Sequence, residues 1–371
     1  MEDGRVRLLA RHIVDFALEL QRGDRLLVEL HGEGLPLALA VVEESFDRGA
    51  RPFVHRHDYR LERALLRGAD ASLLEEIAAF EVARMEKMDA YVDIRGTENL
   101  YAWSDVPQEK LDLYRSRYFG PLHLQRRCGH TRWSVMRYPN DAMAQQAKMS
   151  TKAFEDFYFG ACLVDYGRME RAMRPLVDLM EGTDRVRVVG PGVDLAFSIK
   201  GIGAVALAGR RNLPDGEVYS APVRGSVEGR VRFNVPFPYE GFVLSDVELV
   251  FREGRVVACS CNDGPRLEAI LDTDEGARFP GEFALGVNPE ILHPMADVLF
   301  DEKIAGSFHL TPGNAYANAD NGNRSSVHLD FTCIQRPEYG GGEIYFDDRL
   351  IRKDGLFVVE ALGDLNPDRL S

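Results

Sequence analysis

The sequence predicts an α/β protein of two domains, with an N-terminal doubly wound, mostly parallel sheet and a β-rich α+β C-terminal domain. Two observations support this fold class. The first half alternates short apolar runs with long amphipathic stretches, which is the pattern of successive βαβ units. The second half consists mainly of short β-type runs separated by Gly, Pro, Asn and Asp, which is typical of strands joined by turns.

Length and composition set the broad class. A chain of 371 residues is too long for one ordinary hydrophobic core. A helical stretch ends at Gly182, where the character of the sequence changes, so we expect domains of residues 1–182 and 183–371. The formal net charge of −14 argues against nucleic acid or an anionic membrane as a partner and favours small molecules or peptides.

The N-terminus is expected to form an amphipathic helix and not an export signal. Its apolar residues recur at helical spacing, and no uninterrupted apolar run is present: Val6, Leu9, Ile13, Phe16 and Leu20. No stretch approaches the roughly 18 apolar residues of a membrane-spanning helix. The five cysteines, an odd number without a CxxC pair, indicate neither a disulfide framework nor a zinc ribbon. We therefore expect a cytoplasmic protein with no membrane partner.

The first domain begins with a βαβ unit that has a right-handed crossover. Its expected elements are a buried strand (24–30), a helix closed by Gly49 (35–50), a strand (51–57), one long helix (61–88) and two further strands (88–96 and 131–139). No GxGxxG motif follows the first strand, which argues against a dinucleotide. His55 and His57 share a face near the carboxyl end of a strand, where ligands of such sheets usually bind. Because no carboxylate stands at an obvious spacing from them, we interpret the pair as a solvated strand end.

The stretch of residues 140–182 is helical in pattern, with Ser150 or Thr151 as a cap and Gly182 as its end. After it, residues 184–201 are expected to form two short strands around a Gly-Pro-Gly turn. The expected domain boundary falls between these two segments.

The run SSVHLDF, residues 325–331, places two possible metal ligands on one strand face. Successive side chains of a strand alternate, so His328 and Asp330 point one way and Val327, Leu329 and Phe331 point the other way. A half-exposed strand can produce such a pair by chance. The pair therefore needs support from the rest of the domain.

Further polar residues of metal-binding types are concentrated in the same half: Glu217, Glu282, His309 and Tyr316. Together with His328 and Asp330 they supply two histidines and three carboxylates, which is the ligand set of a dinuclear divalent-metal site. Taken singly, each has an ordinary explanation as a turn residue, a surface residue or a core histidine. Only His328 and Asp330 are tied together by local spacing.

Six stretches of the chain resemble the thermophilic-type metalloaminopeptidase family, the aminopeptidase T and aminopeptidase S group. They occur in one order over both halves: TRWSVMRYPNDAMAQQAKMSTKAFEDFYFGA, VRVVGPGVDLAFSI, NLPDGEVYSAP, GEFALGVNP, EKIAGSFHLTPGNAY and NRSSVHLDF. The resemblance implies metal ligands at Glu217, Glu282, His309, Tyr316, His328 and Asp330 in the second domain. For Tyr316 it allows either metal contact or a hydrogen bond to the reacting carbonyl.

The resemblance also implies an activity. We expect a metallo-aminopeptidase, a hydrolase that uses two divalent metal ions (Zn, Co or Mn) and a metal-activated water on short peptides with a free N-terminus. Glu302 is the candidate general base, and Lys303 is the candidate that stabilises the developing oxyanion. The resemblance further implies a homodimer. The Thr-Pro pair after His309 departs from the Ala-Leu type that looks more usual, so the substrate pocket is expected to differ.

Two other functions are kept as alternatives. One is a mononuclear Fe(II) ring-cleaving dioxygenase of the dihydroxypyridine type, a related branch in which the position of Glu282 looks to be histidine. Carboxylate-rich coordination by Glu217 and Glu282 favours hydrolytic metals over dioxygen chemistry. The other is a non-catalytic binding protein, which the intact set of six matched positions disfavours.

Overall fold

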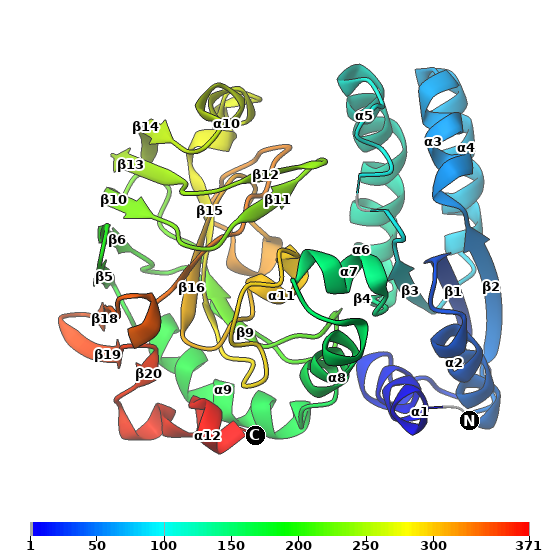
Figure 1. Ribbon diagram of the computed structural model, residues 1–371, viewed down its shortest axis with the longest axis horizontal. Helices are drawn as coiled ribbons and strands as arrows, with labels where there is room; N and C mark the ends of the chain where they lie inside the picture. Colours follow the sequence, from blue (N-terminus) through cyan, green and yellow to red (C-terminus); the bar gives the residue numbers. More distant parts are fainter. Residues whose placement is uncertain (1–2, 100, 371) are drawn as a thin grey trace. The chain divides into compact units, whose positions relative to one another are not determined.

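The computed structural model describes residues 3–99 and 101–370 and divides into two compact units. Unit 1 comprises Met1–Leu163 and Gly209–Leu213, and unit 2 comprises Val164–Ala208 and Pro214–Ser371. Unit 1 holds a parallel sheet and unit 2 holds antiparallel sheets (Figure 1). The predicted mixed α/β fold class is therefore confirmed.

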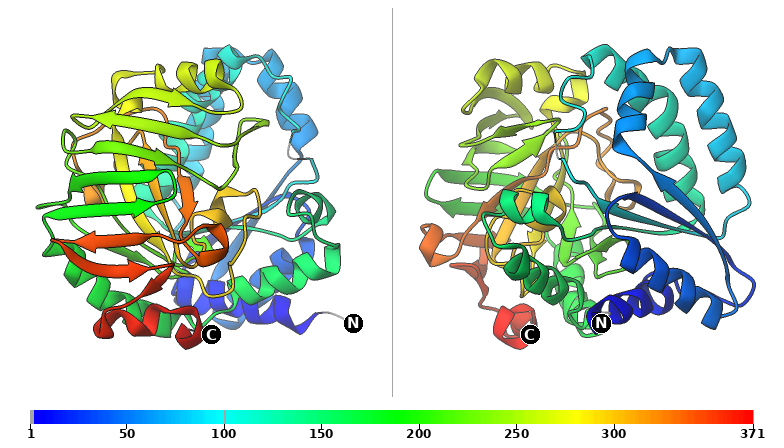
Figure 2. Two further views of the ribbon diagram at one scale, coloured as in Figure 1. Left: turned by 60° about the vertical axis from the view of Figure 1, so that its left-hand side comes forward. Right: turned by 45° about the vertical axis from the view of Figure 1, so that its right-hand side comes forward.

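The sheet of unit 1 has the strand order β2-β1-β3-β4-β8, and every neighbouring pair is parallel. Its strands are β1 (Arg25–Gly32), β2 (Arg51–His57), β3 (Ala90–Gly96), β4 (Arg132–Arg137) and β8 (Asn212–Leu213). Helices α1 and α2 lie on one side of this sheet, and α3, α4 and α5 lie on the other (Figures 1 and 2). The helices are α1 (Gly4–Arg11), η1 (His12–Ala17), α2 (Leu35–Asp47), α3 (Tyr59–Gly68), α4 (Ala71–Met85), α5 (Gln108–Tyr114), η2 (Arg115–Arg127), α6 (Cys128–His130), α7 (Asp141–Gln146) and α8 (Thr151–Cys162).

The long helix expected over residues 61–88 is two helices, α3 and α4. The break falls at Asp70, whose side chain accepts a hydrogen bond from the backbone N–H of Leu73 and so caps the start of α4. An Asp side chain that caps a new helix satisfies N–H groups that have no partner inside the helix. Apolar periodicity alone did not reveal this cap.

Unit 2 contains two large antiparallel sheets and a small one. The eight-stranded sheet is formed, in spatial order, by β14 (Arg255–Ser260), β13 (Glu248–Arg252), β10 (Glu228–Arg232), β6 (Val193–Ser198), β5 (Arg185–Gly190), β18 (Glu343–Phe346), β19 (Arg349–Lys353) and β20 (Leu356–Phe357). The five-stranded sheet is formed by β17 (Phe331–Ile334), β16 (Ser307–Pro312), β15 (Pro280–Gly286), β9 (Glu217–Ser220) and β7 (Val205–Leu207). The pair β11 (Phe237–Tyr239) and β12 (Phe242–Leu244) forms a separate ribbon.

One long helix, α9, and several short helices connect these strands or flank them. They are α9 (Tyr166–Glu181), α10 (Gly264–Leu271), η3 (Glu275–Arg278), α11 (Val298–Asp301), η4 (Ala317–Ala319), η5 (Pro337–Tyr339), η6 (Glu360–Leu365) and α12 (Pro367–Leu370). Helix α9 contacts β7, β9 and η6, so it packs within unit 2. The sequence predicted that α9 would end the N-terminal domain. Gly182, the expected boundary, is the C-cap of α9, whereas the compact units divide between Leu163 and Val164.

The two large sheets of unit 2 share a core. The ring of Phe197 on β6 lies 4.9 Å from the ring of Phe283 on β15, in an edge-to-face contact. Every residue of β15 and of β16 is buried, including Glu282 and His309. A polar side chain on these two strands must therefore find its partner inside the protein.

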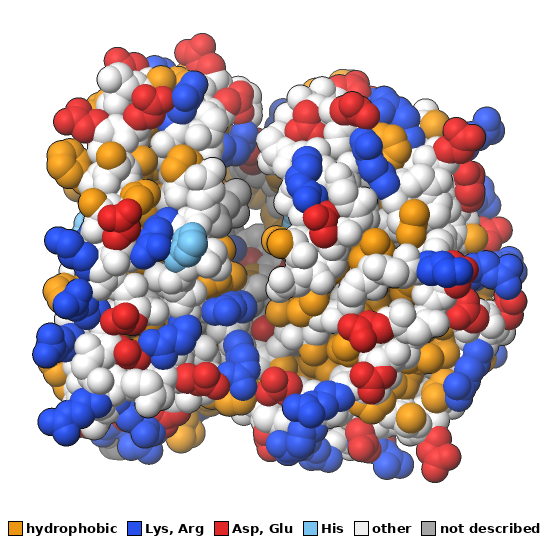
Figure 3. Space-filling model, turned by 180° about the vertical axis from the view of Figure 1, so that it is seen from behind, with side chains coloured by type: hydrophobic (Ala, Val, Ile, Leu, Met, Phe, Trp, Pro, Cys, Tyr) orange, Lys and Arg blue, Asp and Glu red, His pale blue; other side chains and the backbone are white. Residues whose placement is uncertain are grey.

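Among the described residues, no helix has the length and apolar character that crossing a membrane requires. On the face drawn in Figure 3, acidic and basic side chains are interspersed over the surface of each unit.

Gly286 provides a test of how closely β15 packs. An added Cβ would lie 2.4 Å from the carbonyl oxygen of Ile304 and 2.8 Å from Ser307 Oγ. We predict that Gly286→Ala lowers the free energy of unfolding by roughly 1–3 kcal/mol, because the backbone of residues 303–307 must move away. Gly363→Ala is the matched control, since nothing lies within 4 Å of its Cβ position. Equal urea midpoints for the two variants would contradict this packing.

Candidate functional site

Three predicted residues meet on one face of the five-stranded sheet. In the antiparallel register, Ala284 lies opposite His309 and Gly286 lies opposite Glu217. Glu282 stands two positions before Ala284 on the same face. One potential ligand atom from each of Glu217, Glu282 and His309 lies within 4.8 Å of the others. The pleat of three neighbouring strands therefore brings together residues that are far apart in the sequence.

The distances within this first triad are short. His309 Nε2 lies 2.9 Å from Glu282 Oε1 and 3.6 Å from Glu217 Oε2. Three atoms of the triad are buried without a hydrogen-bond partner: Glu217 Oε2, Glu282 Oε2 and His309 Nδ1. A buried polar atom without a partner is costly, so this arrangement is suited to an additional positively charged group.

His328 and Asp330 form a second triad with Glu282. His328 Nε2 lies 3.1 Å from Asp330 Oδ1 and 3.7 Å from Glu282 Oε2. His328 Nδ1 is 2.9 Å from the carbonyl oxygen of Asn314, so Nδ1 donates a hydrogen bond to that oxygen and Nε2 faces the carboxylates. Glu282 belongs to both triads.

The local structure of this pair differs from the expectation in one detail. Strand β17 begins at Phe331, and His328 makes only an isolated bridge with Gly313. The expected strand over residues 325–331 is therefore extended chain that leads into a strand. The predicted shared side holds, because the two side chains contact each other while Leu329 and Phe331 are fully buried.

Lys303 places a cation beside the first triad. Its Nζ lies 2.6 Å from Glu217 Oε1, 2.5 Å from Glu302 Oε1 and 3.8 Å from Asp215 Oδ1, and the lysine side chain is fully buried. The backbone next to Lys303 can approach β15 because Gly286 has no side chain there. The structure thus brings Glu302 and Lys303, both predicted from the sequence, to the same cluster.

The charges of the cluster shift the pKa values of its histidines upward. Burial alone would lower the pKa of His309, but the hydrogen bond to Glu282 and the charges of Glu217 and Glu282 raise it to about 9. Burial likewise opposes protonation of His328, whose pKa the charge of Asp330 raises to about 10. Both imidazoles therefore carry protons that a bound cation would displace.

The pKa values of the acidic groups in the cluster shift in different directions. Burial raises the pKa of the Glu302 carboxyl to about 8, although the Lys303 ammonium opposes this shift. Burial also raises the pKa of Glu282. For Asp330 the charges of His328 outweigh burial, and the pKa falls below its usual range. A carboxyl that titrates near neutral pH, as Glu302 does, can both accept and release a proton there.

Tyr316 lies at the side of the second triad. Its ring centroid is 4.8 Å from that of His328 and 6.0 Å from that of Tyr219. It precedes η4, and 48% of its surface is exposed, unlike the buried residues of the first triad. All eight residues predicted for the site thus lie in one region of unit 2.

Sequence reasoning missed the residues that hold this region in place. Thr311 donates a hydrogen bond to Asp330 Oδ1 at 2.7 Å, and it stands directly opposite Glu282 in the register. The backbone N–H of Asp215 donates to the hydroxyl of Tyr166 on α9, and Asp215 itself faces Lys303. The only sequence signal was adjacency, because Asp215 stands two residues before Glu217 and Thr311 two residues after His309.

Comparison of the sequence with known proteins indicates a family of metalloproteases. A family model described as thermophilic metalloprotease (M29) matches residues 2–338. Aminopeptidase PepS of Streptococcus thermophilus is 24% identical over 87% of this chain and 90% of its own length.

Two solved structures share the fold. Wild-type AmpT from Thermus thermophilus has a TM-score of 0.79 at 23% identity, covering 96% of this chain and 99% of its own. The 2,5-dihydroxypyridine dioxygenase of Pseudomonas putida has a TM-score of 0.60 at 13% identity, covering 96% of this chain and 98% of its own.

Asn323 offers a test of how the loop before His328 is held. Its buried amide donates to the carbonyl oxygens of Gly276 at 2.9 Å, Phe279 at 3.1 Å and Gly313 at 2.6 Å. We predict that Asn323→Ala lowers the free energy of unfolding by roughly 1–3 kcal/mol, because carbonyls lose their donor. Asn323→Asp keeps the shape but turns a carboxylate toward those oxygens, so it should cost more. Asn318→Ala, at an exposed position of the same loop region, is the control; wild-type stability of Asn323→Asp would refute this role.

Proposed function

This chain belongs to the thermophilic metalloprotease family M29, and on that premise we propose that it is an aminopeptidase. It would remove the N-terminal residue of short peptides with two divalent cations held on the sheet face of unit 2. The aminopeptidase activity is what the printed names of its relatives indicate. The residues that would hold the cations are Glu217, Glu282, His309, His328 and Asp330, with Tyr316 at the side.

The observation that carries this proposal is the pair of overlapping triads that share Glu282. A shared carboxylate can contact two cations at once, and each triad adds one imidazole and one further carboxylate. The unpartnered buried atoms Glu217 Oε2 and Glu282 Oε2 are the donors that such cations need. The donor set fits two divalent ions of the zinc, cobalt or manganese type.

When bound, the two cations supply a Lewis acid for the scissile carbonyl and lower the pKa of a water molecule toward neutrality. Glu302 is the group that would accept a proton from that water and pass it to the departing amine, because its pKa of about 8 lies near neutral pH. The Lys303 ammonium contacts Glu302 and Glu217 together, so it orients the base and balances its charge. Lys303 would also stabilise negative charge that develops on the carbonyl oxygen.

The surroundings of the triads suit a substrate with a free amino end. Glu217, Glu282 and Asp330 surround the cluster with carboxylates, which attract a protonated amine or orient a neutral one. Tyr316 is the most exposed of the predicted residues, and its hydroxyl would donate to the carbonyl oxygen of the bound peptide. We infer a cytoplasmic homodimer from the family resemblance, and sedimentation analysis would give its oligomeric state.

The carboxylate content of the site favours hydrolysis over ring cleavage. A mononuclear iron dioxygenase site is built from two imidazoles and one carboxylate with open positions for oxygen. Here Glu282 and Glu217 add carboxylates around His309. This composition supports the hydrolase even though a dioxygenase shares the fold.

One prediction from the proposed function concerns the number of metal ions bound. At saturating Zn²⁺, the wild-type chain should bind two ions in unit 2, and His328→Ala should lose one of them with little change in fold. Glu282→Gln, which alters the residue common to both triads, should weaken both. His293→Ala is the control, because this histidine of the same unit is exposed and lies in neither triad. Metal analysis after dialysis reads the result, and unchanged zinc in both site variants would refute the ligand assignment.

Another prediction concerns how the cleavage rate depends on a free amino end in the substrate. A short peptide should be cleaved from its free amino end, and its N-acetylated form should react at least ~100-fold more slowly, because the scissile carbonyl loses its alignment when the amine is blocked. Chromatography of the released amino acid measures both rates. Equal rates would contradict an exopeptidase, and oxygen uptake with added Fe²⁺ in place of peptide cleavage would favour the dioxygenase.

A further inference from the structure

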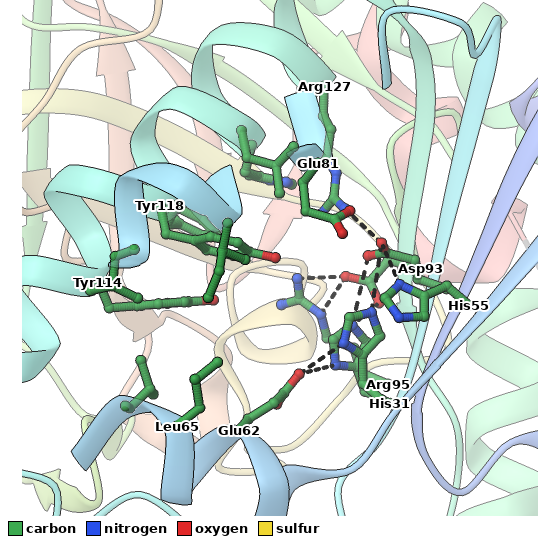
Figure 4. Close-up of a pocket in the computed structure, with 18 of the residues that line it drawn as sticks. His31, His55, Glu62, Leu65, Glu81, Asp93, Arg95, Tyr114, Tyr118 and Arg127 are labelled. Carbon is green, nitrogen blue, oxygen red and sulfur yellow. Dashed lines mark hydrogen bonds and ion pairs between the residues drawn. The ribbon is translucent and has the colours of Figure 1, made fainter. Parts of the chain in front are cut away.

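A second cluster of histidines and carboxylates lies in unit 1. The parallel register places Glu29 opposite His55 and Asp93, and it places His31 opposite His57 and Arg95. Because alternate residues of a strand share a face, three neighbouring strands bring these six side chains to one side of the sheet. Glu62 faces them from α3 (Figure 4). From the sequence, His55 and His57 are interpreted as a solvated strand end. Their carboxylate partners lie on other elements and are therefore not close to them in the sequence.

His31 and His57 lie side by side next to Glu62. Their rings stack with centroids 4.0 Å apart and an angle of 4° between the planes. Glu62 Oε1 lies 3.0 Å from His57 Nδ1 and 3.6 Å from His31 Nδ1. One potential ligand atom from each of the three residues lies within 4.8 Å of the others. Two imidazoles and one carboxylate are a common set of protein ligands for first-row divalent metals.

The other ring nitrogens face buried carboxylates. His31 Nε2 lies 3.4 Å from Asp93 Oδ1, and His57 Nε2 lies 3.6 Å from Glu29 Oε1. Both His57 Nε2 and Asp93 Oδ1 are buried without a hydrogen-bond partner, and Asp93 is only 1% exposed. Histidines that bind metals usually donate their second N–H to a carboxylate, which fixes the ring and strengthens the ligand. The polar groups behind the two rings are therefore those that a metal site requires.

The charges around the cluster select one triad. Glu29 Oε1 already contacts Arg127 at 2.8 Å and Arg84 at 3.0 Å, and Arg84 also reaches His55 Nδ1 at 3.0 Å. These guanidinium groups would repel a dication near Glu29 and His55. Among the described residues, Glu62 makes no ion pair with Lys or Arg, and its ion-pair partners are His31 and His57. Glu62 therefore faces the two imidazoles without a neighbouring guanidinium or ammonium group among the described residues.

A cavity of about 230 Å³ opens beside the triad. Trp103, Tyr114 and Tyr118 contribute aromatic walls, and Figure 4 shows the two tyrosines facing the histidines across it. A mostly apolar cavity with a few convergent polar groups is the usual form of a small-molecule site. An ion held at its floor would keep open coordination positions toward this space.

We propose that His31, His57 and Glu62 bind one divalent first-row transition-metal ion in unit 1, with Zn²⁺ as the reference ion and an open position facing the cavity. Glu29 and Asp93 hold the two imidazoles from behind. The burial of His57 lowers its pKa, but Glu29 and Glu62 outweigh this effect and raise it to about 9, so Zn²⁺ competes with a proton. No residue is shared with the proposed aminopeptidase site, so this proposal does not depend on it.

The decisive measurement is the difference in bound zinc between two matched variants of the full chain. Glu62→Gln keeps the size of the side chain and removes its charge, and Glu76→Gln makes the same change at an exposed position of α4. After equilibrium dialysis against Zn²⁺ at pH 7.5 (about neutral, where neutral imidazole is accessible), metal analysis should show one ion per chain fewer in Glu62→Gln. This difference is independent of how many ions unit 2 binds, so the two proposals can fail separately.

Two further variants guard against a purely structural explanation. His31→Gln should also bind one ion fewer. When Co²⁺ replaces Zn²⁺, this variant should lack the visible absorption that Co²⁺ at this site gives in the wild-type chain. Asp93→Asn leaves all three ligands in place and should weaken the affinity for Zn²⁺ by roughly 10–100-fold. Circular dichroism checks that each variant is folded. Equal zinc content in Glu62→Gln and Glu76→Gln would overturn the site and leave the cluster as a metal-free network of histidines, carboxylates and arginines.

Discussion

The buried ammonium of Lys303 is the interaction on which the carboxylate face of unit 2 depends. It contacts Glu217 and Glu302 at hydrogen-bond distance and faces Asp215 at 3.8 Å, all within a fully buried environment. Carboxylates without a partner in such a place would take up protons and lose their value as ligands. Lys303 pairs with Glu217, whereas Glu282 faces the two histidines.

The approach of Lys303 follows from the packing of the five-stranded sheet. Gly286 leaves space on β15 where the segment around Lys303 and Ile304 comes within contact distance. The same strand supplies Glu282, which lies two pleat repeats before Gly286 on the same face. The neighbouring strand β16 supplies His309. Because both strands are buried along their whole length, the side chains of the site rest on a rigid support.

In unit 1, arginine side chains provide the positive charge beside the buried carboxylates. Arg127 and Arg84 neutralise Glu29 at the floor of the cavity, and Arg95 pairs with Asp93 at 2.6 Å. Glu62 is left facing His31 and His57, much as Glu282 is left facing His309 and His328. In both units a buried cation contacts some of the carboxylates, and another carboxylate lies beside imidazoles. The two clusters are therefore alike in their arrangement of charges, although the sheet is parallel in one unit and antiparallel in the other.

The sequence by itself determined the features that depend on neighbours along the chain. The short runs of residues 24–30 and 51–57 on either side of a helical stretch predicted β1 and β2, and the His-x-Asp spacing placed His328 and Asp330 on one side. The resemblance supplied the residues that local spacing could not connect. Those residues do meet in unit 2, while their role as metal ligands stays a prediction.

Only the tertiary structure decided which distant residues become partners. Strand register brought His309 toward Glu282, and the packing of α3 brought Glu62 to His57. The return of residues 209–213 to pair with β4, and the packing of α9 against unit 2, set the division between the units. Periodicity reports which face of an element is apolar, but it carries no information about which other element covers that face. The carboxylates that accompany His55 and His57 could therefore not be read from their own strand.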